Sequence, residues 1–414
     1  QEEGIGHETM LDISMDIKIN DNQVNKNLVI QKFNISRFSN MELFEITGEE
    51  DVKITFDLNP KIETVTSLNQ EGISATAGNP PRIIKGQYLP LLDWDSIFFR
   101  LLNYRKERGW HNIVFSKDTL RQIMNRDFYS LYCPEHLVNP TNFKDITLVE
   151  DIIVTILKKY VRRVYNQRRH IWSQENIEIA RLTSKHENLI FEKFILKVKE
   201  SEKFVLAEVK DIVEHKLDEI YNKSFKGSHL SNVYFDRHLY QPLLVESNTI
   251  EMAPSGLNQG ERQFVEDLKH YVKNNQILFE DKEIFLLRNL PKRGLGFYGD
   301  TGFYPDFIIW IKFPKKQHLI FVDPHGLVRS RGLEDEKILW TKRIKEIEQA
   351  IREKYKKEDI YLEMYIVSVS PYNDIRSIFG NKPKHILEEN HILFQQDKDY
   401  ICKIFEMINN PQTR

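Results

Sequence analysis

The chain has few cysteines and no long hydrophobic run, and each shortage excludes a class of protein. Two cysteines among 414 residues, Cys133 and Cys402, are too few for a disulfide framework or a cysteine-rich zinc site, which fits a reducing compartment. No apolar run approaches the roughly 18 residues of a membrane span, and the N-terminus shows no signal-peptide pattern. We therefore expect a cytoplasmic protein with no membrane partner.

The chain also lacks a large excess of positive or negative charge, and it lacks nucleotide-binding motifs. The net charge is only −2, so a nucleic-acid surface must be a local patch. The phosphate-binding sequence G-x-x-x-x-G-K-[ST] occurs nowhere, and no apolar strand precedes the acid pair Asp218 and Glu219. The chain as given is therefore not expected to hydrolyse ATP.

The composition is that of several packed domains. Hydrophobic residues make up 41% and aromatic residues 11% of the chain, and 414 residues exceed one ordinary core. We predict a β-rich segment over 1–85, a mainly helical connector over 86–250 and an α/β domain over 251–414. The loop-like stretch 74–81, SATAGNPP, separates the first two. Because Gln1 is not a methionine, we expect a fragment, a processed product or a trimmed chain.

The third region has the clearest order of elements. A helix is predicted to open at Asn258 or Gln259, followed by a strand over 283–290. Two apolar runs, 307–311 and 319–322, are joined by a short basic connector and predict a β-hairpin. A long amphipathic helix and one more strand follow. The order helix, three strands, helix, strand predicts a compact α/β layer.

Two carboxylates flank the predicted hairpin, because Asp306 precedes its first strand and Asp323 follows its second. In an antiparallel hairpin these two positions share one edge, and paired carboxylates are what a hard divalent cation binds. Glu261 lies on the apolar stripe of the preceding helix, where a carboxylate is costly unless it is paired or binds a metal. Taken singly, Asp306 and Asp323 are better explained as ordinary turn positions, but three acids on consecutive elements favour a metal site.

The strongest helix of the middle region is predicted from Leu148 to Trp172 by its apolar repeat. No acid occurs between Ile152 and Gln174. The basic residues and the aromatic residues interleaved with them are Lys158, Lys159, Arg162, Arg163, Arg168 and Arg169, and Tyr160, Tyr165 and Trp172. The helix is either a DNA-phosphate-contacting face with stacking partners or an ordinary solvated face.

Seven stretches, in this order, resemble the C-terminal region of type III restriction endonuclease Res-like proteins, which join a DEAD/DEAH-type helicase motor to a nuclease. They are LDWDSIFFRLLNYRKERGW (92–110), ILKKYVRRVYNQ (156–167), YFDRHLYQPLL (234–244), LNQGERQFVEDL (257–268), IFLLRNL (284–290), FYPDFIIWI (303–311) and IFVDPHGL (320–327). The helix–strand–strand–strand–helix–strand order, with Pro-Asp opening the second strand, also resembles the PD-(D/E)xK nuclease superfamily. The first 85 residues add little to the resemblance.

The resemblance implies a restriction-endonuclease-like, PD-(D/E)xK fold for 251–414 and a DNA endonuclease dependent on Mg²⁺ or Mn²⁺. Glu261, Asp306 and Asp323 would be the metal-binding carboxylates. His325 holds the position of the superfamily's lysine, which positions the attacking water and stabilises charge on the phosphate. A neutral imidazole is a base near pH 7, but it is not a permanent cation.

The resemblance also implies the partners. The substrate would be double-stranded DNA, and the setting would be defence of a prokaryotic cell against foreign DNA. A helicase motor would lie before Gln1 or on another chain, ATP would act only through that motor, and a methyltransferase subunit would be a further partner. The alternative is a catalytically silent nuclease fold that serves as a DNA-binding or interaction module. DNA cleavage in the presence of divalent metal separates the two hypotheses.

Overall fold

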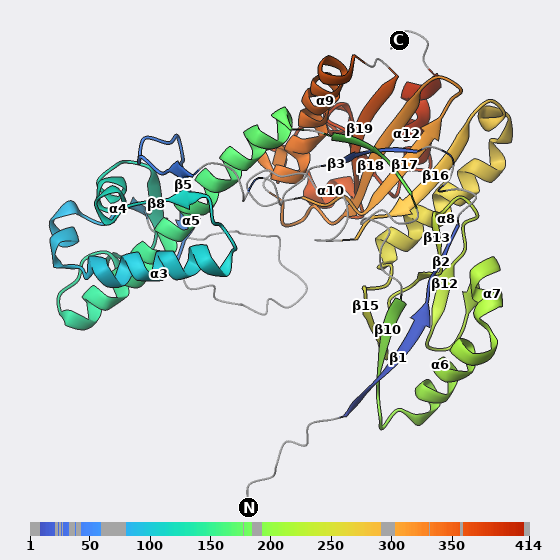
Figure 1. Ribbon diagram of the computed structural model, residues 1–414, viewed down its shortest axis with the longest axis horizontal. Coiled ribbons are helices and arrows are strands. Elements are labelled where there is room, and N and C mark those ends of the chain that lie inside the picture. The colour runs from blue at the N-terminus through green and yellow to red at the C-terminus, as the bar shows by residue number, and fades with distance from the viewer. Residues whose placement is uncertain are drawn as a thin grey trace, which may run out of the picture. The chain divides into compact units, whose positions relative to one another are not determined.

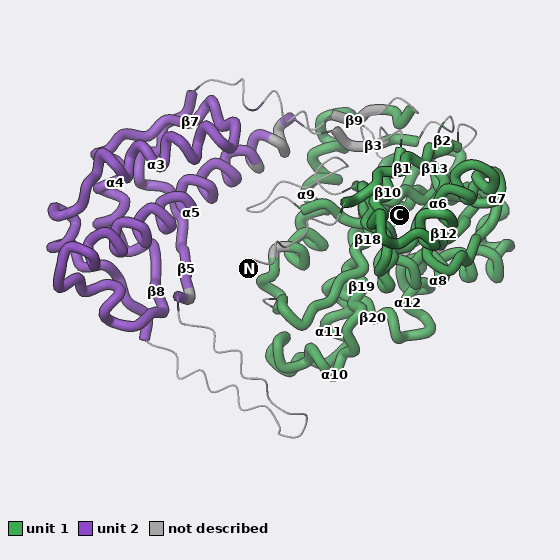
Figure 2. Tube along the Cα trace, turned by 90° about the horizontal axis from the view of Figure 1, so that it is seen from below, with its two compact units in different colours: residues 1–33, 177–297, 302–414 green, residues 34–176, 298–301 purple. Residues whose placement is uncertain are grey.

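The computed structural model describes residues 9–20, 24, 26, 28–32, 38, 43–58, 80–176, 178–183, 193–290, 303–330, 332–356 and 359–409. The chain divides into two compact units, each with its own hydrophobic core (Figure 2). Unit 1 takes its residues from 1–33, 177–297 and 302–414, and unit 2 is built mainly on 34–176. No helix among the described residues is long and apolar enough to cross a membrane.

The unit boundaries differ from the predicted boundaries at 85 and 250 because strands far apart in sequence pair with each other. Strand β1 (Met10–Asp16) pairs antiparallel with β10 (Lys193–Lys199), which pairs antiparallel with β15 (Glu251–Ala253) (Figure 1). The first strand therefore belongs with the C-terminal region, which local sequence patterns do not reveal. Most of the predicted separator 74–81 lies outside the described residues.

Unit 2 is mainly helical, as the middle region was predicted to be. The α-helices that the structure describes there in full are α3 (Trp94–Glu107), α4 (Lys117–Met124) and α5 (Phe143–Glu175). The predicted cap of α4 is confirmed, because the Ser116 hydroxyl accepts a hydrogen bond from the Thr119 amide at 3.0 Å. The shorter elements are β4 (Phe44–Glu45), β5 (Ile54–Asp57), β6 (Pro81–Arg82), η1 (Gly86–Leu91), β7 (Ile113–Val114), β8 (Tyr129–Tyr132) and η2 (Glu135–Leu137).

Unit 1 is a mixed α/β structure around one five-stranded sheet of order β16-β17-β18-β19-β20 (Figure 1). The first three strands are antiparallel, and β18, β19 and β20 are parallel. The elements are α8 (Gln259–Asn274), η3 (Gln276–Phe279), β16 (Glu283–Arg288), β17 (Phe307–Lys312), β18 (Gln317–His325), η4 (Gly332–Glu334), α9 (Glu336–Tyr355), β19 (Ile360–Ser368), α10 (Tyr372–Ile375), α11 (Lys384–Glu389), β20 (Ile392–Phe394) and α12 (Tyr400–Asn409). The predicted order of helix, three strands, helix and strand is confirmed, and further elements follow it.

The remaining elements of unit 1 form small sheets and two helices that precede this layer. They are β2 (Lys18–Ile19), β3 (Val29–Lys32), β9 (Glu178–Arg181), α6 (Lys203–His215), α7 (Leu217–Asn222), β11 (Phe225–Lys226), β12 (Ser231–Val233), β13 (Tyr240–Gln241) and β14 (Leu243–Leu244). Helices α6 and α7 show that the connector predicted over 86–250 is divided between the two units.

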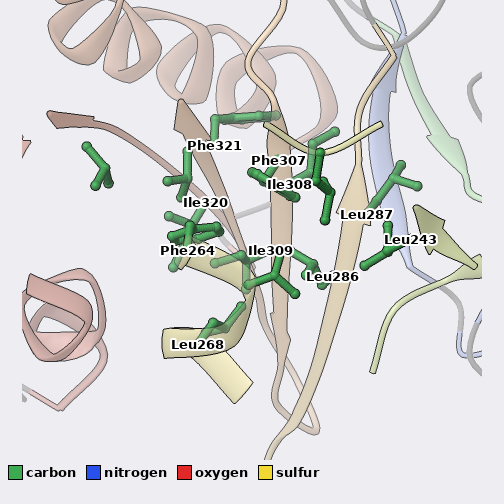
Figure 3. Close-up of a cluster of buried hydrophobic side chains, with 14 of the residues drawn as sticks. Leu243, Phe264, Leu268, Leu286, Leu287, Phe307, Ile308, Ile309, Ile320 and Phe321 are labelled. Carbon is green, nitrogen blue, oxygen red and sulfur yellow. The ribbon is translucent and has the colours of Figure 1, made fainter. Parts of the chain in front are cut away.

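The core of unit 1 fixes α8 against the central sheet. Phe264 and Leu268 of α8 lie among the strand side chains in Figure 3, and the rings of Phe264 and Phe307 are 5.0 Å apart. Each such buried side chain stabilises the fold by roughly 1.5–3 kcal/mol. Because Glu261 lies one turn before Phe264, this packing also determines where that carboxylate stands.

A buried histidine fixes the end of β16. His238 is 0% exposed, and its Nε2 accepts a hydrogen bond from the Arg288 amide at 2.8 Å, while its Nδ1 contacts the Tyr240 carbonyl oxygen. These contacts require the neutral tautomer with the proton on Nδ1. Burial, the largest cause, lowers the pKa of His238 to about 3.

We expect His238→Gln to lose stability because it removes these buried hydrogen bonds. The unfolded chain takes up a proton near the ordinary pKa of 6.5, whereas folded His238 does so only near 3. Its contribution to stability is therefore complete above pH 6.5 and falls as the pH is lowered toward 3. Urea unfolding should show a loss of roughly 1–3 kcal/mol at pH 8 and a smaller loss at pH 5. A loss of equal size at both pH values would contradict the assigned neutral state.

Candidate active site

The two predicted aspartates meet at one end of the β17–β18 hairpin. Phe307 of β17 pairs with Val322 of β18, so Asp306 and Asp323 stand opposite each other one position further along. Residues opposite each other in an antiparallel pair share a face. The sequence-based expectation that the two acids share one edge of the sheet is therefore confirmed.

Asn289, which sequence reasoning did not single out, holds the Pro305-Asp306 segment in place. Its backbone amide donates to the Asp306 carbonyl oxygen at 2.7 Å, and its side-chain amide donates to the Pro305 carbonyl oxygen at 2.8 Å. Asn289 is itself buried at the end of β16. The backbone that carries Asp306 is thus tied to the neighbouring strand by two hydrogen bonds.

Glu261 is buried, and it is paired. It is the third residue of α8, where its Oε2 accepts from the Asn258 amide at 3.1 Å in a capping box. The same Oε2 accepts from Arg288 Nη2 at 3.0 Å. Its Oε1 has no hydrogen bond to any other described residue. Burial raises the pKa of Glu261, and the Arg288 guanidinium opposes that rise.

Negative charge accumulates around Asp306. Burial raises the pKa of Asp306 well above its ordinary value, and the carboxylates of Asp323 and Glu261 raise it further. Within the described part of the chain, the Asp306 side chain forms no hydrogen bond or ion pair. The charges of Lys337 and Arg288 offset only part of this rise. A buried acid beside two others is energetically unfavourable, and such groups concentrate at functional sites.

Lys337, in the first turn of α9, supplies a cation that sequence reasoning missed. Its Nζ lies 3.3 Å from Asp323 Oδ2 and 3.4 Å from Oδ1. Burial raises the pKa of Asp323, and Lys337 is the largest opposing influence. A signal was present in the sequence, because a lysine just after the capping residue Asp335 faces the positive end of the helix dipole.

His325 ends β18 at the solvent edge of the site. Loss of water around the ring, followed by the charge of Lys337, lowers its pKa. The imidazole is therefore neutral near pH 7 and able to accept a proton. The four predicted catalytic positions and Lys337 thus belong to one neighbourhood, since their charges act on one another.

The donor chemistry of the three carboxylates fits a hard divalent cation such as Mg²⁺ or Mn²⁺. Among the described residues, however, no group of three or more His, Cys, Asp or Glu side chains stands together as a ready metal site. Asp323 faces Lys337 and Glu261 faces Arg288. Asp306 and Glu261 Oε1 retain oxygens that make no described hydrogen bond. Metal binding by Glu261, Asp306 and Asp323 stays a prediction.

The basic residues of α5 are partly used within unit 2. Lys159 Nζ donates to the Thr55 carbonyl oxygen at 3.0 Å, and Arg163 donates to the Lys53 carbonyl oxygen. Lys158 Nζ lies 5.3 Å from the centroid of the Tyr104 ring. Arg168 is exposed, whereas the other predicted DNA-contacting residues, Lys158, Lys159, Arg162, Arg163 and Arg169, are half-buried. DNA binding by this helix stays a prediction.

The three aromatic residues interleaved with the basic residues of α5 do not provide base-stacking surfaces. Tyr160, Tyr165 and Trp172 are buried in the core of unit 2, and Tyr165 stacks on Trp110 with ring centroids 4.4 Å apart. The interpretation of these rings as stacking partners for nucleic acid was therefore wrong. The helix is amphipathic, and these three aromatic residues lie on the side that faces the core.

No protein-family model, curated protein or solved structure matches this chain. The membership in the Res-like proteins and in the PD-(D/E)xK superfamily therefore stays a prediction from the sequence resemblance. The α/β class and the element order are established by the structure itself.

We expect Asp306→Asn to stabilise the metal-free protein. A raised pKa in the folded state means that the Asp306 charge destabilises the fold at neutral pH and costs nothing below about 3.8, its ordinary pKa. Urea unfolding in EDTA should show a gain of roughly 0.5–2 kcal/mol at pH 8 that shrinks as the pH falls toward 4. The matched control is Asp12→Asn, on the exposed side of β1. A variant less stable than wild type at pH 8 would show that the carboxylate is structural.

Proposed function

We propose that unit 1 is a metal-dependent nuclease of the PD-(D/E)xK kind that hydrolyses phosphodiester bonds in double-stranded DNA. The observation that supports this most is the placement of Asp306 opposite Asp323 at the open end of the hairpin, with Glu261 close enough to raise the pKa of Asp306. Such a concentration of carboxylates is what divalent-metal phosphoryl chemistry needs. It has no evident role in stabilising the fold.

Each charged residue has a task in this reaction. Bound Mg²⁺ or Mn²⁺ would supply a Lewis acid for the phosphate and lower the pKa of the attacking water. Glu261, Asp306 and Asp323 would hold the metal, and Arg288 and Asn289 would orient Glu261 and Asp306. Lys337 would neutralise charge on the phosphate. His325, neutral and at the solvent edge, would accept a proton from water.

The wider context also remains a proposal. The sequence resemblance points to a Res-like restriction enzyme acting in the prokaryotic cytoplasm, with a helicase motor and a methyltransferase subunit as partners. Arg168 and the half-buried cations of α5 would contact the DNA backbone.

The first test is cleavage of supercoiled plasmid and linear duplex DNA. We expect the wild-type chain to cut with millimolar Mg²⁺ or Mn²⁺ and not with EDTA. Asp306→Ala should lower the rate by roughly 100-fold or more, because it removes a group that supports the transition state. Asp12→Asn, on the exposed side of β1, should cut as wild type does. Equal cleavage by Asp306→Ala would refute the site. Absence of cleavage together with salt-sensitive DNA binding would favour the silent DNA-binding module.

A second test asks whether Lys337 or His325 takes the role of the superfamily's lysine. Because Lys337 carries the cation beside Asp323, Lys337→Met should lower the rate about 100-fold, whereas His325→Ala should lower it about tenfold or less. Adding His325→Lys to Lys337→Met should restore part of the activity by returning a cation to the same edge. If His325→Ala is the more damaging change, the histidine has the essential role and the assignment to Lys337 is wrong.

A further inference from the structure

Lys337 lies against Asp323 in the way that a bound cation would. Its Nζ is almost equidistant from the two carboxylate oxygens, at 3.4 Å from Oδ1 and 3.3 Å from Oδ2. Charge-assisted N–H···O hydrogen bonds are usually about 2.7–2.9 Å long. Both contacts are longer than that, so the ammonium straddles the carboxylate loosely and charge attraction is the main force between them.

Asp323 needs a counter-charge, and Lys337 can leave it. Asp323 is 1% exposed, and a buried carboxylate without a partner is strongly unfavourable. The Lys337 side chain is 33% exposed, so it stands at the border between the carboxylate and solvent. The same Nζ lies 5.3 Å from the centroid of the Phe303 ring, within range of a cation–π contact. The lysine makes this ring contact from the same position in which it contacts Asp323.

Arg288, the other cation of the site, is fixed. It is 6% exposed, and it donates to the Ser255 carbonyl oxygen at 2.6 Å and to the Gly256 carbonyl oxygen at 2.8 Å in addition to Glu261. These backbone contacts do not depend on the charge state or metal content of the site. Backbone carbonyls thus fix Arg288 beside Glu261, whereas the contacts of the Lys337 ammonium within the described part of the chain are with the side chains of Asp323 and Phe303.

We propose that Lys337 is a displaceable counter-ion that controls metal occupancy at Asp323. A divalent cation and the ammonium compete for the same carboxylate, and metal binding releases Lys337 toward the place where a substrate phosphate lies. Metal loading and the supply of a cation to the substrate are then a single event. This inference rests on the proposed function in that it concerns the same carboxylates, but it makes its own statement about metal affinity.

The test is metal binding by the full chain, measured without DNA. Thermal unfolding is followed in EDTA and in rising Mn²⁺ or Ca²⁺, and the affinity is checked by calorimetric titration below the unfolding temperature. Lys337→Met should melt lower than wild type in EDTA, because Asp323 loses its counter-charge. It should bind metal on the order of tenfold more tightly, since its competitor is gone. Lys342→Met, an exposed lysine on α9, is the matched control and should behave as wild type.

Two further variants keep the test decisive. Lys337→Gln retains a hydrogen-bond donor without the charge, so it should also bind metal more tightly even where Lys337→Met folds poorly. Asp323→Asn should lose the rise in melting temperature with metal. Unchanged or weaker metal affinity in both Lys337 variants would overturn the inference, as would a wild-type metal response in Asp323→Asn.

The outcomes separate this inference from the proposed function. Tighter metal binding by the Lys337 variants, with no DNA cleavage by wild type, would support the competition and refute the nuclease. Cleavage that depends on Asp306, with metal affinity unchanged in the Lys337 variants, would support the nuclease and refute the competition.

Discussion

The repulsion among buried carboxylates at the open end of the β17–β18 hairpin is the constraint on which the rest of unit 1 depends. Asp306 stands opposite Asp323 and is influenced by Glu261, so burial and like charge both oppose ionisation there. A fold keeps such an arrangement only when its other contacts determine the backbone strongly. The apolar strands β16 to β19 and the packing of Phe264 on Phe307 provide those contacts.

The polar groups around the site divide into fixed and movable ones. His238 accepts a hydrogen bond from the Arg288 amide, and the Arg288 side chain donates to Glu261. Asn289 donates to the carbonyl oxygens of Pro305 and Asp306. All of these groups are buried and hydrogen-bonded, so they restrict the site to one geometry. Of the two cations that the described residues pair with these acids, Arg288 and Lys337, only Lys337 is partly exposed and loosely paired. The scaffold is therefore rigid where it orients acids and adjustable where it compensates their charge.

The sequence predicted those parts of the site that follow from local geometry. The hairpin, its flanking aspartates and the position of Glu261 on the apolar face of α8 are consequences of strand alternation, helical periodicity and turn placement. The contacts of Arg288, Asn289 and Lys337 were missed because they join residues from separate elements. The same reason explains why β1 was not assigned to the C-terminal unit, since its partner β10 is far along the chain. The prediction that Tyr165 stacks on nucleic-acid bases was wrong because the sequence of one helix does not reveal that Trp110 packs against this ring.

The cation beside Asp323, the ammonium of Lys337, comes from helix α9 and not from strand β18. This placement changes what the cation can do. A lysine on the strand, at the position of His325, would extend directly from the sheet edge and be fixed relative to Asp323 by the backbone. Lys337 instead approaches from a helix N-terminus, where the dipole disfavours a positive charge and the attraction of Asp323 offsets that effect. Removal of the Asp323 charge by metal therefore weakens the main attraction that holds the ammonium in place. A cation in this position responds to the state of the carboxylates, whereas a strand lysine would not.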